Sequence, residues 1–217
     1  MIIAPYNTDA PIYHPPIATA GIMVINVIVF FFTTLQLLLG NVELESIKWL
    51  TLEFDTINPL QWVTHTFMHG DPIHLIGNMI FLWAFGLVVE GKIGTLRFVA
   101  LYLMIALLDG ACTQLPMFLL GSDEFALGAS GVIFALMVIA VIWAPENEMD
   151  CFYWFLFFFG TFEMRLVQLG GIYIFLQIAS LFLSGFSMSS EMLHMIGVMI
   201  GAPIGFYMLR QDMVDCE

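Results

Sequence analysis

One serine in the chain lies where its hydroxyl can act as a nucleophile. Ser130 stands between Gly128 and Gly131 in the segment GASG, at the start of a long apolar run. A serine hydroxyl becomes an effective nucleophile when a neighbouring base accepts its proton. A simpler interpretation is that small residues let membrane helices pack closely. The segment by itself does not decide between the two.

A candidate base occurs in a later apolar stretch, EMLHMIGVMIGAPIG. His194 is followed there by Gly197, Gly201 and Gly205, so small residues line one helical face below the histidine. Such a stripe lets a second helix with small residues approach closely, and the GASG helix qualifies. We therefore expect His194 to come within hydrogen-bond reach of the Ser130 hydroxyl.

Acyl transfer also needs hydrogen-bond donors for the negative oxygen of the tetrahedral intermediate. In the segment HTFMHGDPIHLIGN, His74 and Asn78 are four residues apart and share a helical face. Their side chains can supply donors, and the backbone N–H of Ser130, near a helix start, can supply another. For His65 and His69 we expect a structural role, with the rings bonded to backbone carbonyls.

The composition indicates that the scaffold for these residues lies in a membrane. Of the 217 residues, 60% are hydrophobic and 11% are charged, whereas soluble domains carry about 25% charged residues. The net charge is −13, and lysine and arginine together number only five. So few cations cannot neutralise a phosphate backbone, which argues against a nucleic-acid partner.

Six apolar stretches predict membrane-spanning helices, each of which needs about 20 residues. We expect an all-α membrane protein with a six-helix bundle over residues 17–210, a tail at 1–16 and a second tail at 211–217. The stretches are residues 17–40, 72–89, 96–119, 128–143, 165–185 and 190–210.

Two segments do not fit this pattern of spans. Residues 41–71 are too polar to cross, and we interpret them as an interfacial first loop anchored by Trp49 and Trp62. Residues 151–164 have strong strand propensity and are too short to span. They predict a hairpin at the membrane surface or an extension of the loop.

The distribution of lysine and arginine predicts the orientation in the membrane. Lys92, Arg97, Arg165 and Arg210 fall on one side of the predicted spans, and Lys48 falls on the other. The positive-inside rule then predicts that both termini are cytoplasmic. The helix of the serine begins on the outer side, where water can reach it. Short loops and the lack of a transit peptide favour a bacterial inner (plasma) membrane.

Three motifs together resemble the rhomboid family of intramembrane serine proteases. They are H-x4-H-x3-N from His69, G-A-S-G at 128–131, and H-x2-G-x3-G from His194. Their order, spacing and host helices agree with the family across residues 17–210. The segment FGLVVEGKIGTLRF is also similar to the glutamate-and-glycine loop of the family.

The resemblance implies a Ser–His dyad, with Ser130 as nucleophile and His194 as general base. It implies an oxyanion hole from His74, Asn78 and the Ser130 backbone N–H. The implied reaction is hydrolysis of a peptide bond in or near the transmembrane helix of a single-span or multi-span membrane protein. No metal or cofactor is implied. We assign supporting roles to six further residues: His69, Gly128, Gly131, Phe134, Gly197 and Gly201.

Two positions depart from the family pattern. Many relatives have Trp-Arg in the first loop, where this chain has Leu60-Gln61 and therefore lacks a charged interfacial anchor. Many relatives have a tyrosine four residues after the nucleophile. Phe134 keeps that ring and lacks the hydroxyl. Neither change removes a member of the dyad.

Three alternatives remain at this stage. A non-proteolytic relative that binds client helices is one, although such proteins typically lose the serine or the histidine. Asp109, in the third span, motivates a small transporter, but the chain has no internal repeat. A buried carboxyl with a polar partner is the simpler interpretation of Asp109. A metal site from His65, His69 and His74 is the third, and it lacks the H-E-x-x-H pattern.

Overall fold

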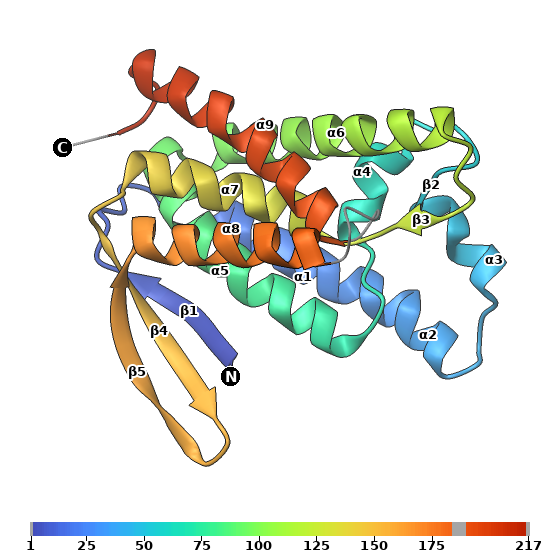
Figure 1. The fold of residues 1–217 in the computed structure, drawn as a ribbon, viewed down its shortest axis with the longest axis horizontal. Coiled ribbons are helices and arrows are strands. Elements are labelled where there is room, and N and C mark those ends of the chain that lie inside the picture. Colours follow the sequence, from blue (N-terminus) through green and yellow to red (C-terminus); the bar gives the residue numbers. More distant parts are fainter. Residues whose placement is uncertain (1, 184–189, 216–217) are drawn as a thin grey trace.

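A bundle of helices forms the body of the protein, and a small sheet projects from one end of it (Figure 1). The computed structural model describes residues 2–183 and 190–215. Residues 184 and 185 of the predicted fifth span, residue 1, and the last two residues of the chain lie outside the described part. The main helices are α1 (Ile17–Phe32), α5 (Pro72–Ile93), α6 (Thr95–Leu119), α7 (Ser130–Trp143), α8 (Leu166–Leu183) and α9 (Ser190–Arg210).

Five helical segments of the described chain are long and apolar enough to cross a membrane. They are Ile17–Leu38, which joins α1 to the short α2 (Thr34–Leu38), together with α5, α6, α8 and α9. Each corresponds to a predicted span, and the protein is an integral membrane protein. The predicted fourth span is the shorter helix α7.

Helix α7 lies inside the bundle, with α5, α6, α8 and α9 packed around it. Its 14 residues rise about 21 Å at about 1.5 Å per residue, less than the roughly 30 Å of hydrocarbon in a bilayer. Most of its side chains are buried against neighbouring helices and not exposed to lipid. Because α7 is shorter than its neighbours and surrounded by them, its first residue can lie inside the membrane and not at its surface.

A buried carboxylate fixes the start of α1 against the end of α5. The Glu90 side chain accepts hydrogen bonds from the backbone N–H groups of Ala18 (2.8 Å) and Thr19 (2.7 Å). The hydroxyls of Thr19 (2.7 Å) and Thr95 (2.8 Å) donate to it as well. These are N–H groups at a helix start, which have no acceptor within their own helix. Glu90 therefore holds α1, α5 and α6 together at one end of the bundle.

The first loop is held against α6 by Gln114. The loop contains α3 (Leu44–Ile47), a 3-10 turn at Lys48–Leu50, β2 (Leu52–Glu53), α4 (Gln61–Thr64) and a 3-10 turn at His65–Phe67. The Gln114 amide donates to the Glu53 carbonyl (2.7 Å) and to the Gln61 side chain (3.1 Å). It also accepts from the Trp62 indole (2.6 Å).

This packing changes the interpretation of two loop residues. Trp62 packs on Gly110 of α6 and is not a free interfacial anchor, whereas Trp49 is 55% exposed. Gln61 occupies the position at which many relatives have an arginine. It is only 3% exposed, and its amide oxygen takes part in the Gln114 network. The loop is thus fixed by buried amide hydrogen bonds.

The sheet is a departure from the all-helical prediction. Strands β4 (Glu148–Phe155) and β5 (Phe158–Arg165) form the hairpin expected at 151–164, extended at both ends. Strand β1 (Ile2–Thr8) pairs antiparallel with β4, giving the order β1-β4-β5. Part of the predicted N-terminal tail is therefore structured. Sequence reasoning missed β1 because its partner strand lies far away in the chain.

Four of the five cations gather at the end of the bundle that carries the sheet. The Asp215 N–H donates to the Lys92 carbonyl (3.0 Å), and Arg97 donates to the Met213 carbonyl (3.4 Å). Arg165 forms a 2.9 Å ion pair with Glu146, and Arg210 ends α9. Figure 1 shows the first loop, which contains Lys48, at the opposite end.

Candidate active site

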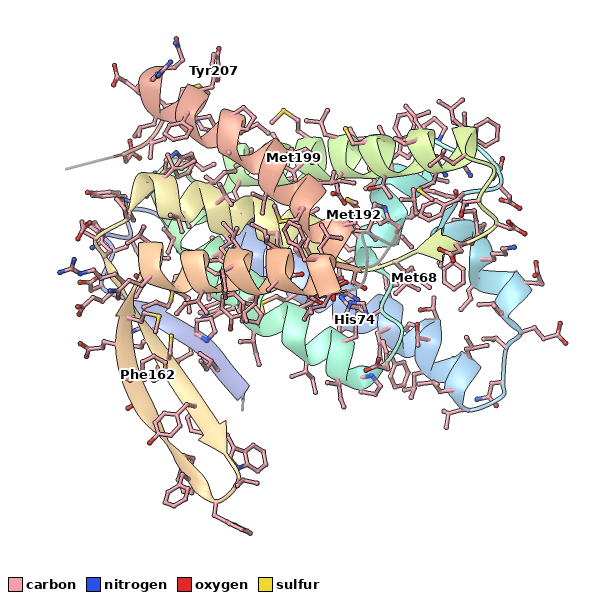
Figure 2. All side chains as sticks on the ribbon, viewed as in Figure 1. Met68, His74, Phe162, Met192, Met199 and Tyr207 are labelled. Carbon is pink, nitrogen blue, oxygen red and sulfur yellow. The ribbon has the colours of Figure 1, made fainter. Side chains whose placement is uncertain are left out.

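A cavity of about 690 Å³ lies among the starts of α5, α7 and α9. Lys92 and Arg210 lie at the opposite ends of α5 and α9. Residues from α5, α7, α8 and α9 line it, among them Ser130, His194, His74, Asn78 and Phe134. Figure 2 labels His74 of α5 and Met192, two residues after the start of α9, in the central part of that view. The structure therefore brings together the residues that the three motifs singled out.

Ser130 is the first residue of α7 and is partly exposed on this cavity. The chain before it needs a glycine, because Gly128 has φ +121°, a value that side chains strongly disfavour. The Gly128 N–H donates to the His65 carbonyl (2.9 Å), which ties the turn to the first loop. Strand β3 (Phe125–Ala126) pairs with β2 just before this turn. The serine is thus held by two contacts with the first loop.

His194 is held on two sides by neighbouring helices. Its ring stacks on Phe134 of α7, with 4.4 Å between centroids and 12° between planes. Its Nδ1 lies 2.9 Å from Oε1 of Gln177 on α8. Because an amide oxygen only accepts, this bond requires a proton on Nδ1. Nε2 of the neutral ring is then free to accept a proton.

The glycines of α9 bring the helix of the histidine against the helix of the serine. A methyl group at Gly201 would lie 2.5 Å from the carbonyl oxygen of Ala135, and one at Gly197 would collide with the Gly131 backbone. Backbone therefore meets backbone, as the stripe predicted. Within the described residues no hydrogen bond joins the Ser130 hydroxyl to the His194 ring. Catalytic hydrogen bonds are often long in sites without substrate.

Two donors converge beside the serine. A methyl group at Gly128 would lie 2.9 Å from Nε2 of His74 and 3.6 Å from Nδ2 of Asn78. The Asn78 Nδ2 is buried and has no hydrogen-bond partner in the described part of the chain. A buried amide without a partner is costly and calls for an explanation. An oxyanion formed at Ser130 would supply the missing acceptor.

His69 and Asp71 support the start of α5 beside these donors. The Asp71 carboxylate caps the helix by accepting from the N–H groups of Ile73 (2.8 Å) and His74 (2.9 Å). These hydrogen bonds lower the pKa of Asp71 below its usual value. Burial lowers the pKa of His69 to about 4, so this ring is neutral at pH 7. It lies edge-on to His74, 5.1 Å away between centroids.

Asp109 and His65 form a buried pair behind the serine. Asp109 is 4% exposed, lies against Gly131, and has an oxygen 3.7 Å from Nε2 of His65. The other ring nitrogen of His65 is 2.7 Å from the Gln61 carbonyl oxygen. The backbone hydrogen bond expected for His65 is confirmed, and His65 is the polar neighbour of Asp109. The same expectation for His69 is not met, because neither of its ring nitrogens has a hydrogen-bond partner among the described residues. No group of three potential metal ligands occurs among residues 2–183 and 190–215.

Sequence reasoning overlooked two residues of the site. Gln177 and Tyr173, both on α8, line the cavity. An amide within an apolar span is itself a sign of function, and this signal could have identified Gln177. Tyr173 lies edge-on to Phe81 of α5, 5.0 Å away between ring centroids. No pattern in the sequence indicates that contact, which joins α8 to α5 across the cavity.

Comparison with known proteins gives the family of the chain. The family model of the Rhomboid domain matches residues 58–211, which is more than half of the chain and includes every residue of the candidate site. The chain belongs to the rhomboid family. The rhomboid match begins within the first loop and ends at α9.

The sequence identity between this chain and individual relatives is low. The chain is 28% identical over 139 residues to the Rhomboid protease GlpG of Yersinia pseudotuberculosis serotype I (strain IP32953), covering 60% of this chain and 48% of that protein. It is 32% identical over 92 residues to the Rhomboid protease GlpG of Salmonella newport (strain SL254), covering 41% and 32%. The chain thus spans about half the length of the first of these curated relatives, and less of the second.

Proposed function

We propose that this rhomboid is an intramembrane serine endopeptidase that cleaves membrane proteins in or near a transmembrane helix. The observation that carries the proposal is the convergence of a serine, a histidine and two donors on one cavity. Ser130, His194, His74 and Asn78 come from three helices and line the same space. The names of its relatives as proteases support the same activity.

The proposed reaction begins with attack of the Ser130 hydroxyl oxygen on the carbonyl carbon of the scissile bond. Nε2 of His194 takes the hydroxyl proton. The negative oxygen of the tetrahedral intermediate receives hydrogen bonds from His74, Asn78 and the Ser130 N–H. When the C–N bond breaks, His194 returns the proton to the leaving amine. A water molecule then hydrolyses the acyl ester by the same route, and the serine is regenerated.

Gln177 acts in this scheme as a positioning residue for His194. Its Oε1 accepts from Nδ1–H and so favours the tautomer in which Nε2 carries no proton and can accept one. Phe134 restrains the same ring by stacking. Together these contacts keep the base in one orientation while the hydroxyl rotates to meet it.

The proposed route for the substrate lies between α5 and α8. Phe81 and Phe85 of α5 and Met137 of α7 line the cavity beside the polar residues, so part of its wall suits apolar side chains. The contact between Tyr173 and Phe81 crosses this route. A substrate segment with small, helix-weakening residues can unwind and present a carbonyl, since a helical backbone otherwise hides it. Its flanking apolar residues then remain in lipid.

We propose an orientation with the cation-rich end in the cytoplasm and the cavity facing the outer side. The clustering of Lys92, Arg97, Arg165 and Arg210 at one end supports it through the positive-inside rule. The bacterial relatives support a bacterial inner membrane as the location.

The test is cleavage of a model single-span substrate in proteoliposomes. We expect the parent protein to cleave it, and Ser130→Ala and His194→Ala to be inactive. Ser190→Ala is the matched control, because Ser190 lines the same cavity and has no proposed chemical role. A fluorophosphonate probe should label the parent and not Ser130→Ala. Cleavage that survives Ser130→Ala would refute the proposal. Substrate capture without cleavage by the parent would favour the non-proteolytic alternative.

A further inference from the structure

The tip of the β4–β5 hairpin is a cluster of large apolar side chains that the described part of the chain leaves largely exposed. Trp154, Leu156, Phe157, Phe158 and Phe159 are 54%, 69%, 92%, 70% and 73% exposed. Isolated apolar residues are common on protein surfaces, but a contiguous cluster of this size marks a contact with a partner or a membrane. We name these five residues the hairpin tip.

The base of the same hairpin has the opposite character. Glu148, Asp150, Glu163 and Arg165 occupy the part of β4 and β5 nearest the bundle. Glu163 and Glu148 lie close enough for the hydrogen bonding and charge of Glu148 to raise the pKa of Glu163. The hairpin therefore changes from charged to aromatic along its length. Such a gradient matches a segment that starts in water or headgroups and ends in an apolar layer.

The hairpin is also directed towards the level of the membrane. In Figure 1 the base of β4 and β5 lies at the left end of the bundle, and the hairpin slants down and to the right from there, so the turn lies below the helices and not further left than they reach. The tip is therefore beside the bundle and not beyond its end. β5 runs directly into α8, which exposes apolar side chains such as Phe175 (66%) along its length. The base of the hairpin is thus joined directly to a helix with exposed apolar side chains.

Contacts at the other edge of the sheet hold the hairpin in this direction. The Trp83 indole of α5 donates to the Tyr6 carbonyl of β1 (3.1 Å), and the Tyr173 hydroxyl of α8 donates to the Ile3 carbonyl (3.3 Å). Phe162 and Met164 of β5 pack against the core of the bundle. The sheet is attached to two spans, so its position relative to the membrane is set by the bundle.

We propose that the hairpin tip inserts into the bilayer, in the leaflet on the cation-rich side. The tip lies in the interfacial layer and not in the hydrocarbon centre, because the outer edge of β5 has no partner strand among the described residues. Unpaired strand groups are not tolerated in hydrocarbon, whereas tryptophan and other aromatic residues favour the interface. This inference depends on the membrane embedding of the bundle and not on the proposed peptidase activity.

The experiment measures which medium surrounds Trp154. The full chain, labelled with 5-fluorotryptophan, is placed at one copy per disc in lipid nanodiscs, and its five tryptophans are followed by fluorine NMR. Trp154→Phe and Trp143→Phe assign two of the resonances. We expect a lipid with a nitroxide near the top of its acyl chain to broaden the Trp154 resonance. A gadolinium chelate in the water should leave it sharp. Trp143, which is buried at 6% exposure, should respond to neither.

A second variant tests whether the tip residues hold the hairpin in the bilayer. Phe157→Ser with Phe159→Ser should make Trp154 accessible to the chelate, since both side chains are exposed and the fold does not need them. Phe175→Ser is the matched control, because it removes another largely exposed ring, from α8, and should leave Trp154 protected. A parent Trp154 that the chelate broadens, or that responds to neither agent, overturns the proposal. So does a double variant in which Trp154 stays as protected as in the parent.

Discussion

The close contact between α7 and α9 predicts a specific effect of adding one methyl group at Gly201. A β-carbon there would lie 2.5 Å from the Ala135 oxygen and 2.7 Å from its α-carbon, whereas ordinary contact begins at about 3.4 Å. The colliding atoms belong to the backbone and cannot rotate away. The two helices must therefore separate locally by the difference between 3.4 and 2.5 Å, about 0.9 Å. Since α9 also carries His194, the base moves relative to Ser130.

The magnitude follows from the precision that acyl transfer requires. A misplacement of about 1 Å can lower a rate about 100-fold. We therefore expect Gly201→Ala to lose about 100-fold in kcat while KM changes little. Overpacking costs about 1–3 kcal/mol, and replacing a helical glycine with alanine returns about 1 kcal/mol. The variant should therefore remain folded.

The assay is cleavage of the single-span substrate in proteoliposomes, with thermal unfolding in detergent measured in parallel. Gly171→Ala is the matched control, because Gly171 lies within α8 and a β-carbon added there would meet nothing within 4 Å. It should keep the parent kcat and gain stability. A Gly201→Ala variant that cleaves at the parent rate refutes the argument that this contact positions the dyad. So does an equal loss in Gly171→Ala.

Three further predictions follow from individual contacts. Gln177→Leu removes the acceptor for His194, a change worth about 1–3 kcal/mol, so kcat should fall about 10- to 100-fold at unchanged KM. Gln177→Glu, which keeps the acceptor, should restore much of the rate. Glu90→Ala leaves buried N–H groups unpaired and should lower the unfolding free energy by about 3 kcal/mol, measured by denaturant titration. Glu146→Ala, at an exposed ion pair, should cost less than about 1 kcal/mol. Burial lowers the pKa of His69 from 6.5 to about 4, so the unfolded chain binds the proton first as pH falls. The contribution of neutral His69 to the free energy of unfolding should be fully present above about pH 6.5. It should decrease by roughly 3 kcal/mol as the pH falls towards 4. His69→Gln should remove the part of this pH dependence that His69 contributes, and a pH profile identical to that of the parent would contradict the prediction.

The local signals in the sequence were sufficient for most of the helical framework. The apolar stretch 72–89 predicted α5, and in the structure Asp71 caps the start of that helix. Hydropathy located every long apolar helix, because a span must satisfy its backbone hydrogen bonds internally and be apolar over about 20 residues. Local strand propensity likewise predicted the hairpin at 151–164. It could not predict β1, since strand pairing joins segments with no local relation.

Some residues of the candidate site could likewise be predicted from the sequence, whereas one of its contacts could not. The types and spacing of Ser130, His194, His74 and Asn78 can be read from the sequence, as can the glycine stripe that lets α9 approach α7. The tertiary structure alone decided that Gln177 faces His194, because the rotation and offset of α8 depend on packing against several helices at once.

The sequence by itself determined the membrane class, the positions of the long helices and the side chains that can carry acyl-transfer chemistry. These depend on composition and short-range periodicity, which are local properties. Only the tertiary structure decided that α7 is a short central helix, that Trp62 and Gln61 fix the first loop through Gln114, and that a three-stranded sheet carries the hairpin tip away from one end of the bundle. Each of these depends on contacts between residues distant in the chain, which no single segment specifies.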